Sequence, residues 1–321
     1  MIEIGGISIP PAKKQRLEIP VARLPTQTQI SLPVTVVNGI SPGPVIWLSA
    51  AIHGDEINGV EIIRQVLERI SPQQLHGTVI AVPIVNVFGF IEQSRYLPDR
   101  RDLNRSFPGS TRGSLGGRLA KLFMEEIVSK STHGIDLHTA SDGRTNLPQI
   151  RANLHDEGTY QCAKAFAAPV MIHSQTRDGS LRQAATQGGI PVLLYEAGEA
   201  LRFDARAIAL GVEGILRVMA GLNMYPSNLP APPLPAVATE TKWTRASRSG
   251  ILRLNVGLGD RVEKKQLLGT ISDAFGEEMT RIRASGDGLV ISVLLNPLVN
   301  QGDAIVHLAT VNEKPLFPHS N

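Results

Sequence analysis

Continuous apolar stretches alternate with amphipathic helical stretches over the first two thirds of the chain. Residues 44–52 (PVIWLSAAI) are apolar almost throughout and are bounded by turn residues, which predicts a strand buried on both faces. The stretch that follows, 56–70, has its isoleucine, valine and leucine residues three and four positions apart, which predicts an amphipathic helix. A strand buried on both faces must lie in a sheet that helices cover on each side.

The alternation continues to about residue 222. We expect further strands at 30–37, 78–85, 134–138 and 190–196, and further helices at 115–129, 156–167 and 203–222. This order predicts an α/β domain, residues 1–225, with a mostly parallel or mixed sheet flanked by helices. Residues 1–40 form its β-rich N-terminal part.

The composition changes after this domain. Residues 226–237 (PSNLPAPPLPAV) are proline-rich and are interpreted as a linker. In residues 238–321, two similar segments, 249–262 and 287–305, each combine a short apolar strand with a Gly-Asp turn. They predict a smaller all-β sandwich or barrel that resembles the biotinyl/lipoyl type. The hairpin between its halves has no lysine, so we do not expect a swinging-arm carrier.

The overall composition narrows the class of protein. Hydrophobic residues make up 42% and charged residues 19% of the 321 residues, as in globular proteins. The net charge is only +3 and no long Lys/Arg run occurs, so we expect no nucleic-acid partner. No apolar run approaches the ~20 residues that cross a bilayer. With a single cysteine and no signal peptide in sight, we expect a cytoplasmic protein. The composition is compatible with a monomer and with a homo-oligomer.

Histidines and glutamates follow three of the predicted strands. His53 and Glu56 come after the strand 44–52, His138 ends the strand 134–138, and Glu196 ends the strand 190–196. Taken singly, Glu56 could cap a helix, His138 could be a structural histidine and Glu196 could belong to a salt bridge. In one parallel sheet, however, all four would meet at the same edge. Two histidines and a carboxylate leave an open position on zinc, and a fourth acid can serve as the base.

An arginine-rich loop lies between the first two of these strands. Residues 95–109 (RYLPDRRDLNRSFPG) contain four arginines among loop-forming residues. Arginine suits capture of a carboxylate and stabilisation of an oxyanion. The alternative is a solvated loop held by salt bridges to Asp99 and Asp102. Beside a metal site we prefer the functional interpretation.

Together these motifs resemble the succinylglutamate desuccinylase/aspartoacylase family, within the zinc carboxypeptidase-like clan. The resemblance is carried by HGDE at 53–56, DLNRSFPG at 102–109, DLH at 136–138 and EAG at 196–198. It covers about residues 40–220, and the family's members also have a C-terminal β-domain. By this resemblance His53, Glu56 and His138 would bind one Zn²⁺ per chain. Glu196 would be the general acid/base that activates water.

The resemblance also implies roles for the arginine-rich loop. Asn104 and Arg105 would bind the carboxylate of the substrate, and Arg95 would polarise the scissile carbonyl. Arg100 or Arg101 could take the role of Arg95, because the segment before Asn104 is longer than in aspartoacylase.

The function expected is hydrolysis of the amide bond of a small, carboxylate-bearing N-acyl amino acid. A zinc carboxypeptidase or esterase is the alternative within the same chemistry. A different class is a non-catalytic metal-binding or scaffold protein, whose β-domain would mediate interactions.

Overall fold

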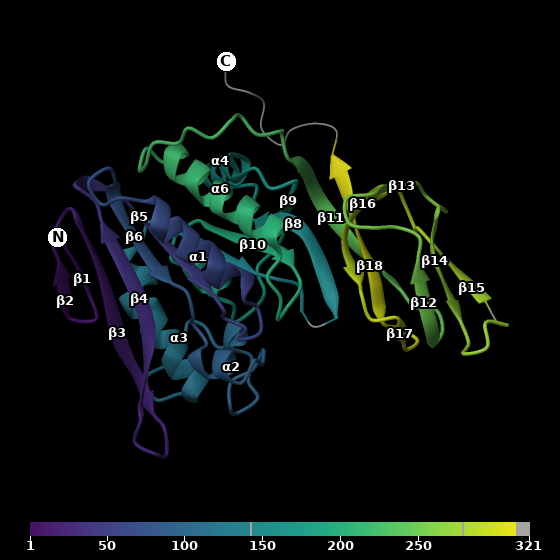
Figure 1. The fold of residues 1–321 in the computed structure, drawn as a ribbon, viewed down its shortest axis with the longest axis horizontal. Coiled ribbons are helices and arrows are strands. Elements are labelled where there is room, and N and C mark those ends of the chain that lie inside the picture. The colour runs from purple at the N-terminus through teal and green to yellow at the C-terminus, as the bar shows by residue number, and fades with distance from the viewer. Residues whose placement is uncertain (142, 278, 313–321) are drawn as a thin grey trace.

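A twelve-stranded mixed sheet forms the centre of the protein (Figure 1). The structure is a computed structural model that describes residues 1–141, 143–277 and 279–312. The strands are β3 (Lys13–Arg23), β4 (Gln29–Asn38), β5 (Ser41–Ala50), β6 (His76–Val82), β7 (His133–His138), β8 (Arg144–Ala152), β9 (Val170–His173), β10 (Val192–Gly198), β11 (Ala236–Arg245), β13 (Arg261–Val262), β16 (Gly288–Leu294) and β18 (Ala304–Asn312). Their spatial order is β13-β16-β18-β11-β9-β8-β10-β7-β5-β6-β4-β3.

Helices cover both faces of this sheet, as the apolar strands predicted. α1 (Asn58–Arg69), α4 (Glu157–Phe166) and α6 (Ala205–Gly221) pack together over one face. α2 (Val87–Ile91), α3 (Leu115–Glu126), α5 (Leu181–Gln187) and two 3₁₀ turns, Leu103–Arg105 and Val128–Lys130, complete the helical elements. Two separate apolar cores result, one beneath each helical layer. The predicted α/β class is therefore confirmed.

The central strands run parallel, so their carboxyl ends meet at one edge. β5 pairs in parallel with β6 and β7, and β7 pairs in parallel with β10. β8, which the sequence did not predict, runs antiparallel beside β10, and β4 runs antiparallel beside β6, so the sheet is mixed. The edge at the ends of β5, β7 and β10 is where the candidate residues lie.

The C-terminal residues form a β-sandwich, one sheet of which continues the central sheet. A four-stranded antiparallel sheet of β12 (Gly250–Leu254), β14 (Leu267–Ser272), β15 (Met279–Arg283) and β17 (Leu298–Val299) packs through a third apolar core against β13, β16 and β18. β11 pairs in parallel with β9, and β16 pairs antiparallel with β8.

Three further features complete the description. A small hairpin, β1 (Ile2–Ile4) and β2 (Ile7–Ile9), precedes β3. β11 begins at Ala236, inside the end of the predicted linker, and residues 313–321 of the predicted C-terminal domain lie outside the described residues. No helix in the described part of the chain is long and apolar enough to span a membrane.

Candidate metal centre and active site

The loop after β5 places His53 and Glu56 at the edge of the sheet. Gly54 lies against the backbone of α2, and a Cβ at this position would be 2.0 Å from the carbonyl carbon of Gly89. The Glu56 N–H donates to the His53 carbonyl oxygen at 3.1 Å and closes a turn. α1 consequently begins at Asn58, two residues later than predicted, and Glu56 belongs to the site.

His53, Glu56 and His138 converge on one point. Nδ1 of His53 lies 2.7 Å from Oε1 of Glu56, and Nδ1 of His138 lies 2.7 Å from Oε2 of Glu56. All three side chains are buried, and their ligand atoms lie within 4.8 Å of one another. Imidazole nitrogen and carboxylate oxygen are common ligands of zinc. This donor set, with one carboxylate and two histidines, fits a single divalent metal ion.

The second nitrogen of each histidine faces a carboxylate. Nε2 of His138 lies 2.8 Å from Oδ2 of Asp136, whose Oδ1 accepts a hydrogen bond from Ser49 at 2.7 Å. Nε2 of His53 lies 3.2 Å from Oδ1 of Asp102. Metal-binding histidines commonly have such carboxylate partners, which fix the ring and its tautomer. From the sequence, Asp102 was interpreted only as a salt-bridge partner within its loop, and its contact with His53 was not predicted.

The charges of this cluster are tightly coupled. Burial raises the pKa of Glu56, but the His53 and His138 rings outweigh it and hold that pKa well below its usual range. Burial lowers the pKa of His138, but the Asp136 and Glu56 carboxylates raise it well above its usual range. Glu56 is therefore ionised at neutral pH, as a metal ligand must be.

Glu196 lies on the same face of the sheet as His138. The two residues are directly paired in the parallel β7–β10 ladder, so their side chains project side by side. Nδ2 of Asn146 donates to Oε2 of Glu196 at 2.8 Å, and Nε of Arg151 lies 3.7 Å from Oε1. Glu199, the next acid along the chain, is three residues away and pairs instead with Arg202 at 3.4 Å.

The arginine-rich loop places Arg95 beside His53, Glu56 and His138, the three candidate metal ligands, which are called the metal group below. Nη1 of Arg95 lies 3.3 Å from Oε1 of Glu56, and Nη2 lies 3.0 Å from Oδ2 of Asp102. Arg101, the nearest alternative, is exposed and pairs with Asp99. Of the three arginines considered for this role, Arg95, Arg100 and Arg101, it is Arg95 that lines the cavity.

Asn104 and Arg105 occupy the 3₁₀ turn that follows. Oδ1 of Asn104 accepts a hydrogen bond from the backbone N–H of Leu181 at 2.9 Å, which ties the loop to α5. Arg105 donates to the carbonyl oxygen of Asn104 at 2.5 Å. Both side chains line the same cavity as the metal group.

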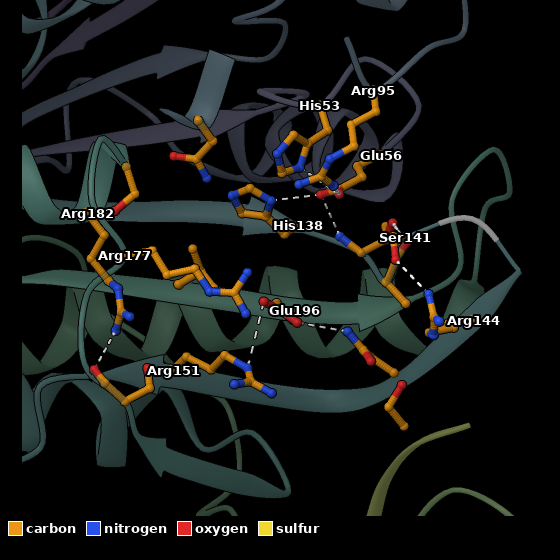
Figure 2. Close-up of a pocket in the computed structure, with 18 of the residues that line it drawn as sticks. His53, Glu56, Arg95, His138, Ser141, Arg144, Arg151, Arg177, Arg182 and Glu196 are labelled. Atoms are coloured by element: carbon orange, nitrogen blue, oxygen red, sulfur yellow. Dashed lines mark hydrogen bonds and ion pairs between the residues drawn. The ribbon is translucent and has the colours of Figure 1, made fainter. Parts of the chain in front are cut away.

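That cavity has a volume of about 270 Å³ and is strongly cationic (Figure 2). Two glutamates, Glu56 and Glu196, are the only carboxylate side chains that line it within the described residues. Six arginines line it: Arg95, Arg105, Arg144, Arg151, Arg177 and Arg182. Burial, and after it the charge of Arg151, lower the pKa of Arg182 to about 10, which shows how closely these cations are gathered.

Figure 2 shows Arg177 and Arg182 on one side of Glu196, and Ser141 and Arg144 on the other side.

Several residues of the cavity were not predicted from the sequence. They include Asn146 and four of the arginines, Arg144, Arg151, Arg177 and Arg182. Three lining residues from the C-terminal strands were missed as well: Trp243, Ser292 and His307.

Comparison with known proteins identifies the family of this chain. The model of the "Succinylglutamate desuccinylase/Aspartoacylase catalytic domain" matches residues 42–222. The N-alpha-acetyl-L-2,4-diaminobutyric acid deacetylase of Halomonas elongata is 28% identical over 298 residues, which cover 88% of this chain and 87% of the relative.

Solved structures show the same fold over nearly the whole chain. The product-bound ectoine utilization protein EutE (DoeB) of Ruegeria pomeroyi has a TM-score of 0.84 and 24% identity, covering 94% of this chain and 97% of its own. A succinylglutamate desuccinylase/aspartoacylase from Rhodobacter sphaeroides has the same score and identity, covering 95% of this chain and 99% of its own. Since the family model spans more than half of the chain, the protein belongs to the succinylglutamate desuccinylase/aspartoacylase family and is a hydrolase.

Proposed function

We propose that this protein uses one Zn²⁺, held by His53, Glu56 and His138, to hydrolyse the amide bond of a small N-acyl amino acid with a free carboxylate. The observation that carries the proposal is the pairing of His138 with Glu196, which sets an acid beside the metal group on one face of the sheet. The membership of a deacylase family supports the reaction class.

The bound metal would lower the pKa of a water molecule toward ~7 and polarise a carbonyl group. Glu196 would take the proton from the attacking water and return it to the leaving amine. Asn146 donates to one oxygen of Glu196, and Arg151 lies 3.7 Å from the other, so both hold the carboxylate in place beside the reacting atoms. Arg95 would donate to the carbonyl oxygen as negative charge develops on it.

Asn104 and Arg105 would bind the carboxylate of the amino-acid half. A guanidinium offers two parallel N–H donors, which match the geometry of a carboxylate. The six arginines of the cavity favour an anionic substrate over a neutral or cationic one.

The shape of the cavity argues against a peptidase. Trp243, Ser292 and His307 come from C-terminal strands and line the cavity on the far side of β8 and β10 from His138. A volume of about 270 Å³ lies just below the usual range for ligand sites, about 300–1,000 Å³, and suits a small acyl–amino acid. A polypeptide substrate would need an open groove on this side.

Elemental analysis of protein purified without added metal, followed by assays on a panel of N-acyl amino acids, tests the proposal. We expect one zinc per chain and turnover of acylated amino acids. Glu196→Gln should keep the metal and lose ~10²–10⁴-fold in kcat, because an amide cannot accept the proton. The matched control, Glu199→Gln, should keep normal turnover. Near-normal kcat in Glu196→Gln would remove this residue from the mechanism.

A further inference from the structure

The outer face of the four-stranded C-terminal sheet exposes apolar side chains. Figure 1 shows β14 and β15 at the end of the molecule farthest from the N-terminal hairpin. The inner face of this sheet packs on the third apolar core through Leu252, Ile271 and Ile282. The residues that alternate with these point outward, because successive side chains of a strand lie on opposite faces. Among the outward residues, Met279 is 61% and Leu298 is 67% exposed.

The apolar residues of this outer face form one row. Ile251 on β12 pairs with Leu298 on β17 and with Ser272 on β14. Ser272 pairs in turn with Met279 on β15, so the row crosses all four strands. Phe275, at the tip of the β14–β15 hairpin beside the row, is 87% exposed. Exposed apolar side chains that adjoin one another in this way mark an interaction surface.

A row of arginines lies on one side of the apolar row. Arg253 pairs with Thr270, and Thr270 pairs with Arg281. This row is two residues, or about 7 Å, along the strands from the apolar row. Nη1 of Arg253 donates to Oγ of Ser272 at 2.9 Å, which places both side chains on the outer face. Arg253 and Arg281 are exposed, so this side of the face is positively charged.

Acidic residues lie on the other side of the apolar row, at the hairpin tip. Oδ1 of Asp273 accepts hydrogen bonds from the backbone N–H of Phe275 at 3.1 Å and of Glu277 at 3.0 Å, which holds the tip in shape. Glu277 comes two residues before Met279, and Arg281 comes two residues after it. The two charges are therefore about equally far from the apolar row. Along the strands, the face changes from acidic through apolar to basic.

We infer that a second copy of this chain covers this face in a symmetric dimer. A two-fold axis that runs along the apolar row, between the copies, places the two rows against each other. The same rotation reverses the strand direction, so it sets the acidic tip of each copy over Arg253 and Arg281 of the other. Every contact of such an isologous interface occurs twice. The face is thus complementary in charge to itself, which favours a second copy over an unrelated partner.

The size of the face sets the expected strength of the dimer. Strands ~4.8 Å apart, most of them about five residues long at ~3.3 Å each, give a flat area on the order of 300 Å². With side chains and hairpin tips, two such faces bury a total area near the ~1,000 Å² at which specific interfaces begin. We therefore expect a reversible dimer with a dissociation constant in the micromolar range.

The active-site cavity stays outside this interface. Its C-terminal lining residues, Trp243, Ser292 and His307, belong to the other sheet of the sandwich. Each copy therefore keeps a complete site of its own. The inference does not depend on the proposed function, and each can fail without the other.

Sedimentation velocity of the full-length protein, over about a hundredfold range of concentration around ~10 µM, tests the inference. The wild type should change reversibly from monomer to dimer as the concentration rises. Arg281→Glu and Glu277→Arg each bring like charges together in both symmetric contacts, so each should raise the dissociation constant about tenfold or more. Met279→Glu should do the same by placing a charge in the apolar row. Arg261→Glu, exposed on β13 in the other sheet, is the matched control and should dimerise normally.

A mixture of the two charge-reversal variants gives the sharpest test. In a mixed dimer, the acidic tip of Arg281→Glu faces Arg281 of the other variant, and the reversed tip of Glu277→Arg faces the new glutamate. The mixture should therefore dimerise at concentrations where each variant alone is a monomer. The variant that carries both substitutions should dimerise with itself for the same reason. Thermal melting of each variant reports whether it folds.

Three outcomes would overturn the inference. The first is a wild-type protein that stays monomeric over the whole range, including one that instead binds vesicles of phosphatidylglycerol and so uses the face on an anionic lipid surface. The second is a dimer that persists in Arg281→Glu, Glu277→Arg and Met279→Glu, because it must then form through another surface. The third is recovery in the double variant without recovery in the mixture, because the charges would then meet within one chain.

Discussion

His307 should make the folded protein sensitive to mild acid. The ring is 6% exposed and stacked on Trp243. Burial, with a contribution from the charge of Arg151, lowers the pKa of His307 to about 3, whereas an unfolded histidine has a pKa near ~6.5. The folded state thus favours the neutral ring, and the unfolded state binds the proton first as the pH falls.

The sign and size of the effect follow from proton linkage. The stability that the neutral His307 preserves is present above pH ~6.5 and is lost as the pH falls toward about 3. At pH 5 the unfolded state gains RT ln(1 + 10^1.5), or about 2 kcal/mol, from protonating this single residue. His307→Phe keeps a ring on Trp243 but cannot bind a proton.

Urea unfolding at pH 8 and pH 5 measures this difference. Between the two values the wild-type protein should lose about 2 kcal/mol more unfolding free energy than His307→Phe. His307→Gln is the control for packing, because it should show the same pH-dependent difference even if its stability at pH 8 is lower. Equal losses in the wild type and both variants would show that the ring is already protonated, or accessible to protons, in the folded state.

Two further predictions concern the site. His138→Ala should lower the metal content clearly below one ion per chain in elemental analysis. The reason is that the substitution removes one of the three proposed ligands together with its contact to Asp136. A metal content of one ion per chain in this variant would refute the ligand assignment. Arg105→Lys should lower kcat/KM on an N-acyl amino acid about tenfold or more with zinc content unchanged, since lysine keeps the charge but loses the paired donors. If the wild-type enzyme had the same kcat/KM for the methyl ester of this substrate as for the free acid, the assignment of a carboxylate site would be wrong.

The sequence was enough to predict the site residues at the ends of strands, because an apolar run followed by a polar residue can be recognised within a few positions of the chain. His138 and Glu196 each end an apolar strand, and parallel strands bring such ends together without any further information. The structure places both beside His53 and Glu56 in one cavity, although their chemical roles stay predictions.

The second half of the cavity could not be predicted for two physical reasons. β8 carries Pro148 and polar residues that face the cavity, and a register shift opposite Glu196 and Gly198 puts Asn146 and Gln149 on the same face. It therefore has neither an apolar run nor a regular alternation. Trp243 on β11 and His307 on β18 reach the site only because β11 joins β9 and carries β18 into the sheet, and no local pattern reveals such long-range pairing.

The unbroken sheet has a mechanical consequence. Backbone hydrogen bonds from β9 to β11 and from β8 to β16 tie the C-terminal strands to the floor of the cavity. These strands cannot swing away as a hinged cover without breaking the ladders. Any movement that admits substrate must therefore involve other parts of the lining, such as the arginine-rich loop that carries Arg95, Asn104 and Arg105. A chain cut before β11 would expose bare edges of β8 and β9, which invite aggregation, so the C-terminal part is a wall of the enzyme and not a removable attachment.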